Sequence, residues 1–121
     1  MIEGYYYLRR CGRLIEIHVV KSQEVLCEAL TLRVEVFVDE QKVSVSDEVD
    51  HLDNMAAIED GSVIHVVAIC DSQIVGTARI ILDVPKDEYP HIGRVAVKRE
   101  MRGSHIGSVI MNKLHQILEG K

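Results

Sequence analysis

The sequence predicts an α/β domain (α+β layered) in which helices flank a sheet. Strand-like stretches of alternating or β-branched residues alternate along the chain with two stretches of helical periodicity, and turn residues separate them. The length of 121 residues fits one compact domain. A chain of this length buries roughly two-thirds of its unfolded surface, which is enough for a hydrophobic core.

The first expected strand covers residues 13–20, where the side chains alternate between two faces. We expect Ile15, Ile17 and Val19 to face the core. Ser22 can cap a helix that runs from residue 23 to about residue 40. The positions that recur along one face of this helix are Leu26, Leu30, Arg33 or Val34, and Phe37.

The second half of the chain contains a hairpin, a further strand and a helix. Residues 43–54 are polar and acidic and predict a loop. The β-branched segments 62–71 and 74–82 indicate an antiparallel hairpin, and residues 91–98 predict a fourth strand after a break at Pro85 to Pro90. A basic segment leads into a helix at 104–120. Its apolar stripe consists of Ile106, Val109, Ile110, Leu114, Ile117 and Leu118, and Asn112, Lys113, His115 and Gln116 lie off the stripe.

Composition excludes several classes of protein. The net charge of −5 argues against an extended nucleic-acid-binding surface. No run approaches the ~18 to 20 apolar residues of a membrane span, and the first thirteen residues lack the apolar core of a secretory signal, so a cytoplasmic or nuclear location is expected. Cys11, Cys27 and Cys70 form no CxxC pair, and no metal site is expected. We expect reduced thiols, at least two of them buried.

Charge is unevenly distributed along the chain. Residues 94–102 hold three more basic than acidic side chains, and residues 47–53 hold four carboxylates. A run of charges is usually a solvated loop, and we interpret the acidic run in that way. His65 lies within an apolar strand, where we expect a packed or hydrogen-bonded histidine rather than a ligand.

The segment 91–114 has the most informative pattern. A strand runs into a turn with Arg102 and Gly103, and a helix follows, so that free main-chain N–H groups converge at one point. With the positive end of the helix dipole, they form an anion site suited to a diphosphate. Gly107 removes a side chain where a ligand could approach, and Arg102 with a neighbouring cation supplies matching charge. The alternative is a helix start in a basic turn that binds no nucleotide.

Four segments resemble the GNAT (N-acetyltransferase) superfamily. After the strand 92–97, residues 102–107 (RGSHIG) resemble its acetyl-CoA-binding motif, Arg/Gln-x-x-Gly-x-Gly/Ala. Residues 32–41, 48–53 and 75–79 resemble a first-helix, an acidic-loop and a strand signature of one bacterial-type branch. The resemblance implies an acyl-CoA N-acyltransferase-like mixed sheet with flanking helices, lacking the C-terminal strands and the fourth helix. Residues 1–12 would be an N-terminal extension and residues 13–121 a partial GNAT domain.

The resemblance implies acetyl-CoA as co-substrate. Similar proteins hold the pantetheine arm along the main chain of the fourth strand and the diphosphate in the turn, and a main-chain N–H near Val97 would polarise the thioester carbonyl. The implied cofactor-binding residues are Val95, Ala96, Val97, Arg102, Gly103, Ser104, His105, Ile106, Gly107 and Ser108.

The resemblance also implies an amine acceptor and a base. In several branches a Glu or His at the start of this strand accepts the proton of the amine, and His91 occupies that position. The alternative is a solvent-facing histidine. Glu40, Glu48 and Asp50 would lie near the acceptor, to attract a cationic amine or fix a loop, or they are solvated. The implied function is acetyl transfer from acetyl-CoA to a primary amine of a small molecule or peptide.

The sequence departs from the family pattern at two places. His105 stands where the motif usually has its central glycine, and there its side chain either crowds a diphosphate or adds a contact when protonated. The family's further strands, and the tyrosine that protonates the departing thiolate, have no counterpart before Lys121. An alternative function is therefore a non-catalytic acetyl-CoA-binding or protein-interaction module. The open sheet edge is expected to favour a homodimer.

Overall fold

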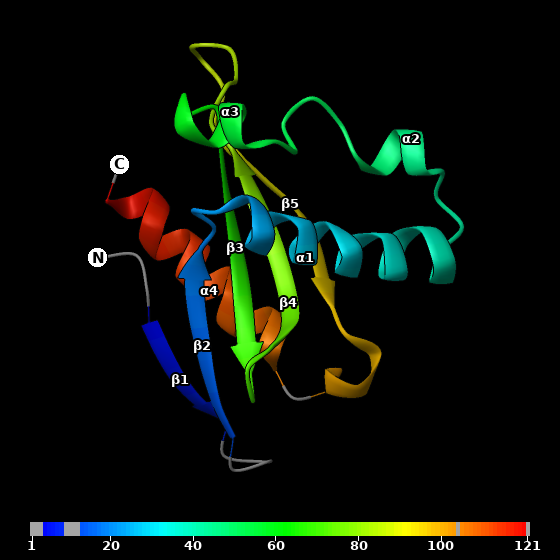
Figure 1. The fold of residues 1–121 in the computed structure, drawn as a ribbon. Coiled ribbons are helices and arrows are strands. Elements are labelled where there is room, and N and C mark those ends of the chain that lie inside the picture. Colours follow the sequence, from blue (N-terminus) through cyan, green and yellow to red (C-terminus); the bar gives the residue numbers. More distant parts are fainter. Residues whose placement is uncertain (1–3, 9–12, 104, 121) are drawn as a thin grey trace.

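A five-stranded antiparallel sheet with helices on both faces forms the domain (Figure 1). In this computed structural model, residues 4–8, 13–103 and 105–120 are described. The strands follow in chain order across the sheet: β1 (Gly4–Leu8), β2 (Arg13–Val19), β3 (Val63–Cys70), β4 (Gln73–Ile81) and β5 (His91–Val97). The helices are α1 (Gln23–Arg33), η1 (Val34–Glu40), α2 (Val45–Glu48), α3 (Met55–Glu59), η2 (Arg99–Met101) and α4 (Ile106–Glu119). The predicted layered α/β class is confirmed.

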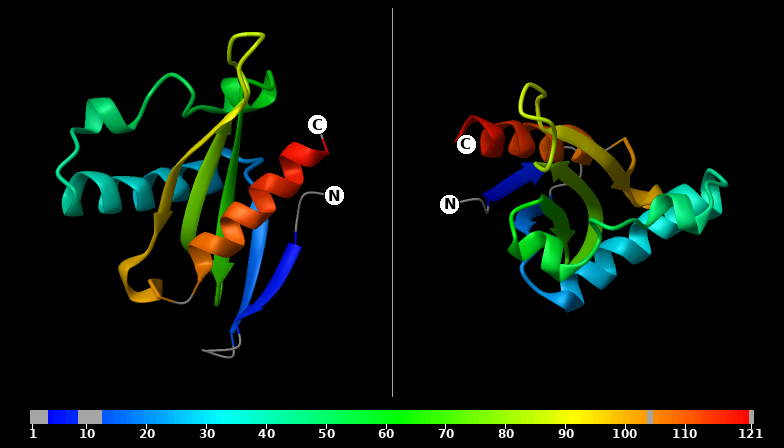
Figure 2. Two further views of the ribbon diagram at one scale, coloured as in Figure 1. Left: turned by 180° about the vertical axis from the view of Figure 1, so that it is seen from behind. Right: turned by 90° about the horizontal axis from the view of Figure 1, so that it is seen from above.

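The two long helices cover opposite faces of the sheet (Figure 2). On the α4 face, Ile15 and Ile17 of β2 are fully buried in one cluster with Ile110 and Leu114 of α4. On the α1 face, Leu26 packs in a second cluster with Val20, which follows β2, and with Val67 of β3. The predicted inward orientation of Ile15 and Ile17 is therefore confirmed.

The predicted first helix begins and ends where expected, but it consists of an α-helix followed by a π-helix. Ser22 caps it by accepting a hydrogen bond from the Val25 N–H at 3.3 Å. From Val34 to Glu40 the helix is a π-helix, and the Gln41 N–H donates to the Val36 carbonyl five residues back. Such wide turns are frequent at functional sites, and this one carries Glu40 to the end of the helix.

The hairpin of β3 and β4 forms as predicted. Cys70 pairs with Gln73, so the turn between the strands has only two residues, Asp71 and Ser72. Both have positive φ, 51° and 64°, as a type I′ turn requires. The fourth predicted strand is β5, which pairs with β4 at the edge of the sheet.

Three predictions about local structure were incomplete or wrong. Strand β1 was not predicted, although three consecutive tyrosines favour a strand. The predicted loop at 43–54 contains α2, because the Ser44 side chain caps it by accepting from the Asp47 N–H. Lys113, predicted off the apolar stripe of α4, is only 8% exposed. Its long aliphatic stem can lie along the apolar core.

The cysteines are free thiols where the structure describes them. Cys70 is buried and Cys27 is exposed. The expected second buried thiol would have to be Cys11, which lies outside the described residues. Within the described ranges, no group of three or more metal-ligating side chains is present, and no helix is long and apolar enough to cross a membrane.

The outer edge of β5 has no strand partner among the described residues. An edge of this kind offers unpaired main-chain groups to another chain. The homodimer expected through this edge stays a prediction, which light scattering on the concentrated protein tests; a stable monomer would count against it.

Candidate functional site

A cavity of about 270 Å³ lies between the end of β5 and the first turn of α4. The short helix η2 and a turn join these two elements, and buried Met101 anchors the turn to the core. Seven of the ten residues predicted to bind the cofactor line the cavity together with Met101: Val97, Arg102, Gly103, His105, Ile106, Gly107 and Ser108. Ser104 lies outside the described residues. Val95 and Ala96 lie further back along β5.

The turn depends on two residues in the left-handed region. Gly103 has a φ of 84° and His105 has a φ of 65°. A side chain with a Cβ is disfavoured there, which explains physically why a glycine fits position 105. The first N–H groups of α4 point out of the helix end beside the cavity, since they have no acceptor within the helix.

His105→Gly is expected to raise the free energy of unfolding by about 0.5–1 kcal/mol, because glycine relieves the positive φ. Denaturant unfolding measures the change. The matched control is His115→Gly on the exposed face of α4, where glycine should lower stability by about as much. A destabilised His105→Gly protein would contradict this account of the turn.

Strand β5 is interrupted by a bulge. Between the pairs Thr77↔Ala96 and Arg79↔Gly93, β5 advances three residues while β4 advances two. Arg94, in this interval, has a φ of 53°. The extra residue allows Ile92 and Val95, which a regular strand would place on opposite faces, to pack on the same α4-side cluster.

Ala96 is buried on the other face with Leu32 and Val36. The predicted contacts of Val95 to Val97 involve the main chain, so buried side chains are compatible with them.

Glu40 binds two arginines of the basic segment. Its carboxylate accepts from Arg99 Nε at 2.9 Å and from Arg102 Nη2 at 2.5 Å. The hydrogen bond from Arg102 is the main cause that holds the pKa of Glu40 below its usual value. Arg102 Nε also donates to the Val97 carbonyl at 3.1 Å. The helix end that carries Glu40 is thereby tied to the turn and to the end of β5.

The basic segment is therefore not the free cluster of positive charge that the sequence suggests. Lys98 lies 3.8 Å from Glu100, and Arg94 lies 3.5 Å from Glu48. An anion at the turn would depend on main-chain N–H groups and would share Arg102 with Glu40.

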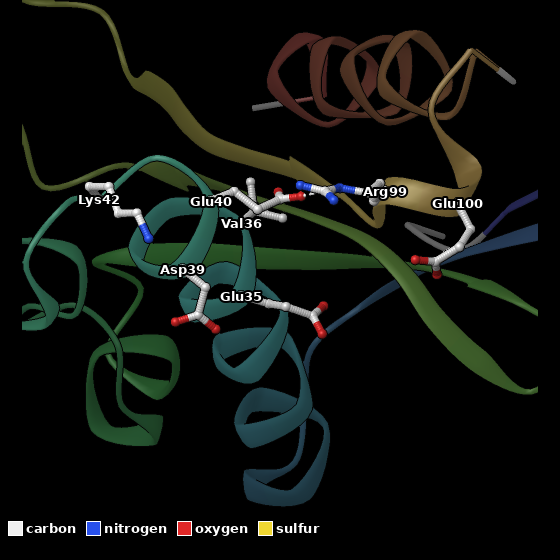
Figure 3. Close-up of a pocket in the computed structure, with 7 residues that line it drawn as sticks. All are labelled: Glu35, Val36, Asp39, Glu40, Lys42, Arg99 and Glu100. Carbon is white, nitrogen blue, oxygen red and sulfur yellow. Dashed lines mark hydrogen bonds and ion pairs between the residues drawn. The ribbon is translucent and has the colours of Figure 1, made fainter.

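A second, larger cavity of about 480 Å³ has Glu40 in its lining. Its lining contains four carboxylates and two cations, and Glu40 and Arg99 point toward one another across it (Figure 3). The lining residues are Glu35, Val36, Asp39, Glu40, Lys42, Arg99 and Glu100.

The acidic run at 47–53 is not a solvated loop, and that interpretation is wrong. The side chains of Glu48 and Asp53 are 3% and 0% exposed. Arg33 of α1 donates to Glu48 at 2.9 Å and to Asp53 at 2.7 Å. Arg79 of β4 donates to Asp50 at 2.8 Å and to Asp53 at 3.0 Å. We call Arg33, Glu48, Asp50, Asp53 and Arg79 the buried ion network.

Two carboxylates of the buried ion network, Asp50 and Asp53, are held in their charged form. The hydrogen bonds from Arg79 are the main cause that lowers the pKa of Asp50 well below its usual range. Burial alone would raise the pKa of Asp53, but hydrogen bonds from Arg33 and from the Asp50 N–H outweigh it, so that this pKa is also lowered. Glu48 and Asp50 thus hold the segment in place. This agrees with the alternative from the sequence in which they fix a loop.

His65 is buried against this network and is hydrogen-bonded, as predicted. Its Nε2 lies 3.1 Å from the Leu52 carbonyl oxygen and 3.6 Å from Asp53. Burial is the main cause that lowers its pKa below 6.5. The side chain therefore resists protonation in the folded protein.

Stability is expected to fall on acidification in two ranges. Below about pH 6.5 the unfolded chain protonates His65 while the folded chain does not, and below about pH 4 the same holds for Asp50 and Asp53. Each group can contribute up to about 1.4 kcal/mol per pH unit. Denaturant unfolding between pH 3 and 8 measures the slope, and His65→Gln should remove the slope of the upper range. A pH-independent stability of the wild type between pH 5 and 7 would contradict the prediction for His65.

His91 lies at the start of β5, at the opposite end of the strand from the cavity. Its side chain is 59% exposed, and Nε2 lies 3.9 Å from the Glu88 carboxylate. The structure thus leaves His91 accessible to a partner in solution but does not bring it to the turn.

Three roles were not predicted from the sequence: those of Arg33 and Arg79 as partners of the acidic segment at residues 47–53, and that of Met101 as the anchor of the turn. A signal existed for both arginines, because Arg33 lies on the inner face of a helix and Arg79 lies within an apolar strand. A buried charge in such a position requires a charged partner.

Comparisons with known proteins agree with this geometry. The family described as "Acetyltransferase (GNAT) family" matches residues 26–121. The chain is 32% identical over 98 residues to the uncharacterized N-acetyltransferase YjcF of Bacillus subtilis (strain 168), covering 81% of this chain and 63% of that relative. It therefore spans less than two thirds of the length of this curated relative.

Two solved structures have the same fold. Escherichia coli ElaA superimposes with a TM-score of 0.73 at 29% identity, covering 86% of this chain and 69% of that one. An acyl-CoA N-acyltransferase from Pseudomonas aeruginosa has a TM-score of 0.73 at 30% identity, covering 87% and 69%. These likenesses confirm the acyl-CoA N-acyltransferase-like fold class.

Proposed function

Since the chain belongs to the acetyltransferase (GNAT) family, we propose that it transfers an acetyl group from acetyl-CoA to a primary amine of a small molecule or peptide. The observation that carries the proposal is the cavity at the start of α4, which is lined by Val97 and by residues 101–103 and 105–108 of the turn. The similar protein from Pseudomonas aeruginosa is described as an acyl-CoA N-acyltransferase, which supports the same class of donor.

The cavity fits the diphosphate of acetyl-CoA. Gly107 leaves space beside Val97, because a Cβ added at Gly107 would have Val97 Cγ2, 4.0 Å away, as its nearest neighbour. A Cβ at Gly103 would meet nothing within 4 Å. The N–H groups of the turn and the positive end of α4 favour a doubly charged anion there. Arg102 can add a hydrogen bond if it turns from Glu40 to the ligand.

Strand β5 is the proposed site for the pantetheine arm and the thioester. Its outer edge provides main-chain donors and acceptors, and it leads from the cavity toward His91. Acetyl-CoA supplies an activated acetyl group: the amine nitrogen bonds to the carbonyl carbon, the carbon–sulfur bond breaks, and coenzyme A leaves as the thiolate, which takes a proton from solvent to become the thiol. A main-chain N–H near Val97 would stabilise the negative charge that develops on the carbonyl oxygen.

We assign His91 as the base that accepts the proton of the amine through intervening water, because His91 lies at the opposite end of β5 from Val97. The imidazole is accessible, and histidine suits proton transfer near neutral pH. With His91→Gln, we expect kcat to fall by about 10²-fold, while the Kd for acetyl-CoA stays unchanged. An unchanged kcat would mean that His91 is a surface residue with no part in the proton transfer.

Calorimetric titration of acetyl-CoA, followed by thiol release with a panel of primary amines, tests the proposal. We expect binding by the wild type and by His105→Gly, and amine-dependent thiol release. Absence of binding by both proteins would overturn the cofactor assignment. Binding without thiol release from any amine would favour the non-catalytic alternative.

A further inference from the structure

The Arg94 side chain connects the bulge of β5 to the acidic segment at residues 47–53. Arg94 has a φ of 53°, a conformation that is unfavourable for a residue with a Cβ, at the point where the pairing register of β4 and β5 shifts. Such a conformation persists only where surrounding contacts compensate for it.

The contacts of the Arg94 guanidinium provide this compensation. Nε donates to the Glu48 carbonyl oxygen at 3.3 Å and Nη2 to the Asp47 carbonyl oxygen at 3.1 Å. The same two nitrogens lie 3.5 Å from the Glu48 carboxylate and 3.6 Å from that of Asp50. A planar fork with several donors matches this set of acceptors, and an ammonium group would not.

The acceptors of Arg94 are themselves held in place. The Glu48 side chain is buried and bound by Arg33 of α1, and Asp50 accepts two hydrogen bonds from Arg79, one from each terminal nitrogen. The guanidinium of Arg94 is therefore attached to a network that is anchored in α1 and β4. Through it, the position of the bulge is coupled to α1 and to the neighbouring strand β4.

We propose that Arg94 is a positioning residue for acetyl transfer, which fixes the main chain of β5 at residues 95–97 by attaching the bulge to the acidic segment. The inference rests on the proposed function, in which this main chain aligns the thioester. Because the diphosphate is held at the turn, loss of the attachment should disturb alignment more than binding. Displacement of a reacting group by about 1 Å can cost up to 10²-fold in rate.

Three variants and two readouts test the inference. Arg94→Asn tolerates the positive φ best among non-glycine residues and removes the guanidinium, Arg94→Lys keeps the charge without the fork, and Lys86→Gln removes an exposed positive charge in the loop before β5. The first readout is amide hydrogen exchange of the ligand-free proteins. The second is kcat and KM for acetyl-CoA, measured well below the unfolding temperature of each variant.

We expect exchange at residues 95–97 to be at least tenfold faster in both Arg94 variants than in Lys86→Gln. We expect kcat to fall tenfold or more while KM for acetyl-CoA changes less than threefold. A variant that merely unfolds would lower the active fraction and speed exchange throughout the sheet, and that result would overturn the positioning role. Unchanged exchange and kcat in a folded Arg94→Asn would overturn it as well.

Failure of the proposed function is visible separately, because the wild type would then neither bind acetyl-CoA nor release thiol. In that case amide hydrogen exchange alone tests whether Arg94 attaches the bulge of β5 to the acidic segment. Faster exchange at residues 95–97 alone in the Arg94 variants would support this attachment. Exchange rates equal to those of Lys86→Gln would reject it.

Discussion

Asp53→Asn is expected to lower the free energy of unfolding by about 3–5 kcal/mol, the largest effect on stability that the structure predicts for a nearly isosteric change. The Asp53 carboxylate accepts hydrogen bonds from Arg33, Arg79 and the Asp50 N–H, and its side chain is fully buried. An amide has one acceptor oxygen and no charge, so two buried guanidinium groups would lose their shared counter-ion. Denaturant unfolding at neutral pH measures the loss.

Asp87→Asn is the matched control, since Asp87 lies in the exposed loop between β4 and β5. Its stability should stay within about 0.5 kcal/mol of the wild type. Equal stabilities of the two variants would mean that the buried ion network contributes nothing, and the explanation for the acidic segment would fail.

Gly107→Glu is expected to weaken acetyl-CoA binding by about 100-fold or more while the fold stays intact. The new side chain would fill the cavity beside Val97 and place a negative charge at the diphosphate position. A factor of 100 corresponds to about 2.7 kcal/mol. Stability should be unchanged or higher, because a glycine is replaced in a helix and a carboxylate in the first turn interacts favourably with the helix dipole.

Asn112→Glu adds the same charge on the exposed face of α4, outside the lining of the cavity. Calorimetric titration of both variants should show loss of binding for Gly107→Glu only. If Gly107→Glu binds acetyl-CoA as tightly as Asn112→Glu does, the ligand does not occupy this cavity.

Local patterns were sufficient to predict most of the regular structure. The β-branched segments before and after Asp71 indicate the hairpin, because side-chain alternation and a two-residue turn are properties of neighbouring residues. The turn at 101–108 could also be predicted from its own residues, since a basic turn with glycines before an amphipathic helix is a local signal. Gly103 and Gly107 line the cavity as that signal predicts, and the helix begins at Ile106, two residues after its predicted start.

Contacts between distant residues could not be predicted in this way. Arg102 binds Glu40, which is 62 residues away in sequence, and Arg79 binds Asp50 across 29 residues. Sequence periodicity indicates which face of an element a residue occupies, but it does not identify the residue's ion-pair partner. The acidic segment was therefore interpreted as a solvated loop. The bulge at Arg94 was hidden for a related reason, since it depends on how β5 is placed against both α4 and the acidic segment.

The proposed function requires that the turn at 101–108 and the end of β5 hold acetyl-CoA. An amide chemical-shift titration of the isotope-labelled chain with acetyl-CoA measures this binding residue by residue. We expect saturable shifts that are largest at the amides of residues 103–108 and 95–98. Absence of saturable shifts, or shifts confined to other parts of the chain, would contradict it.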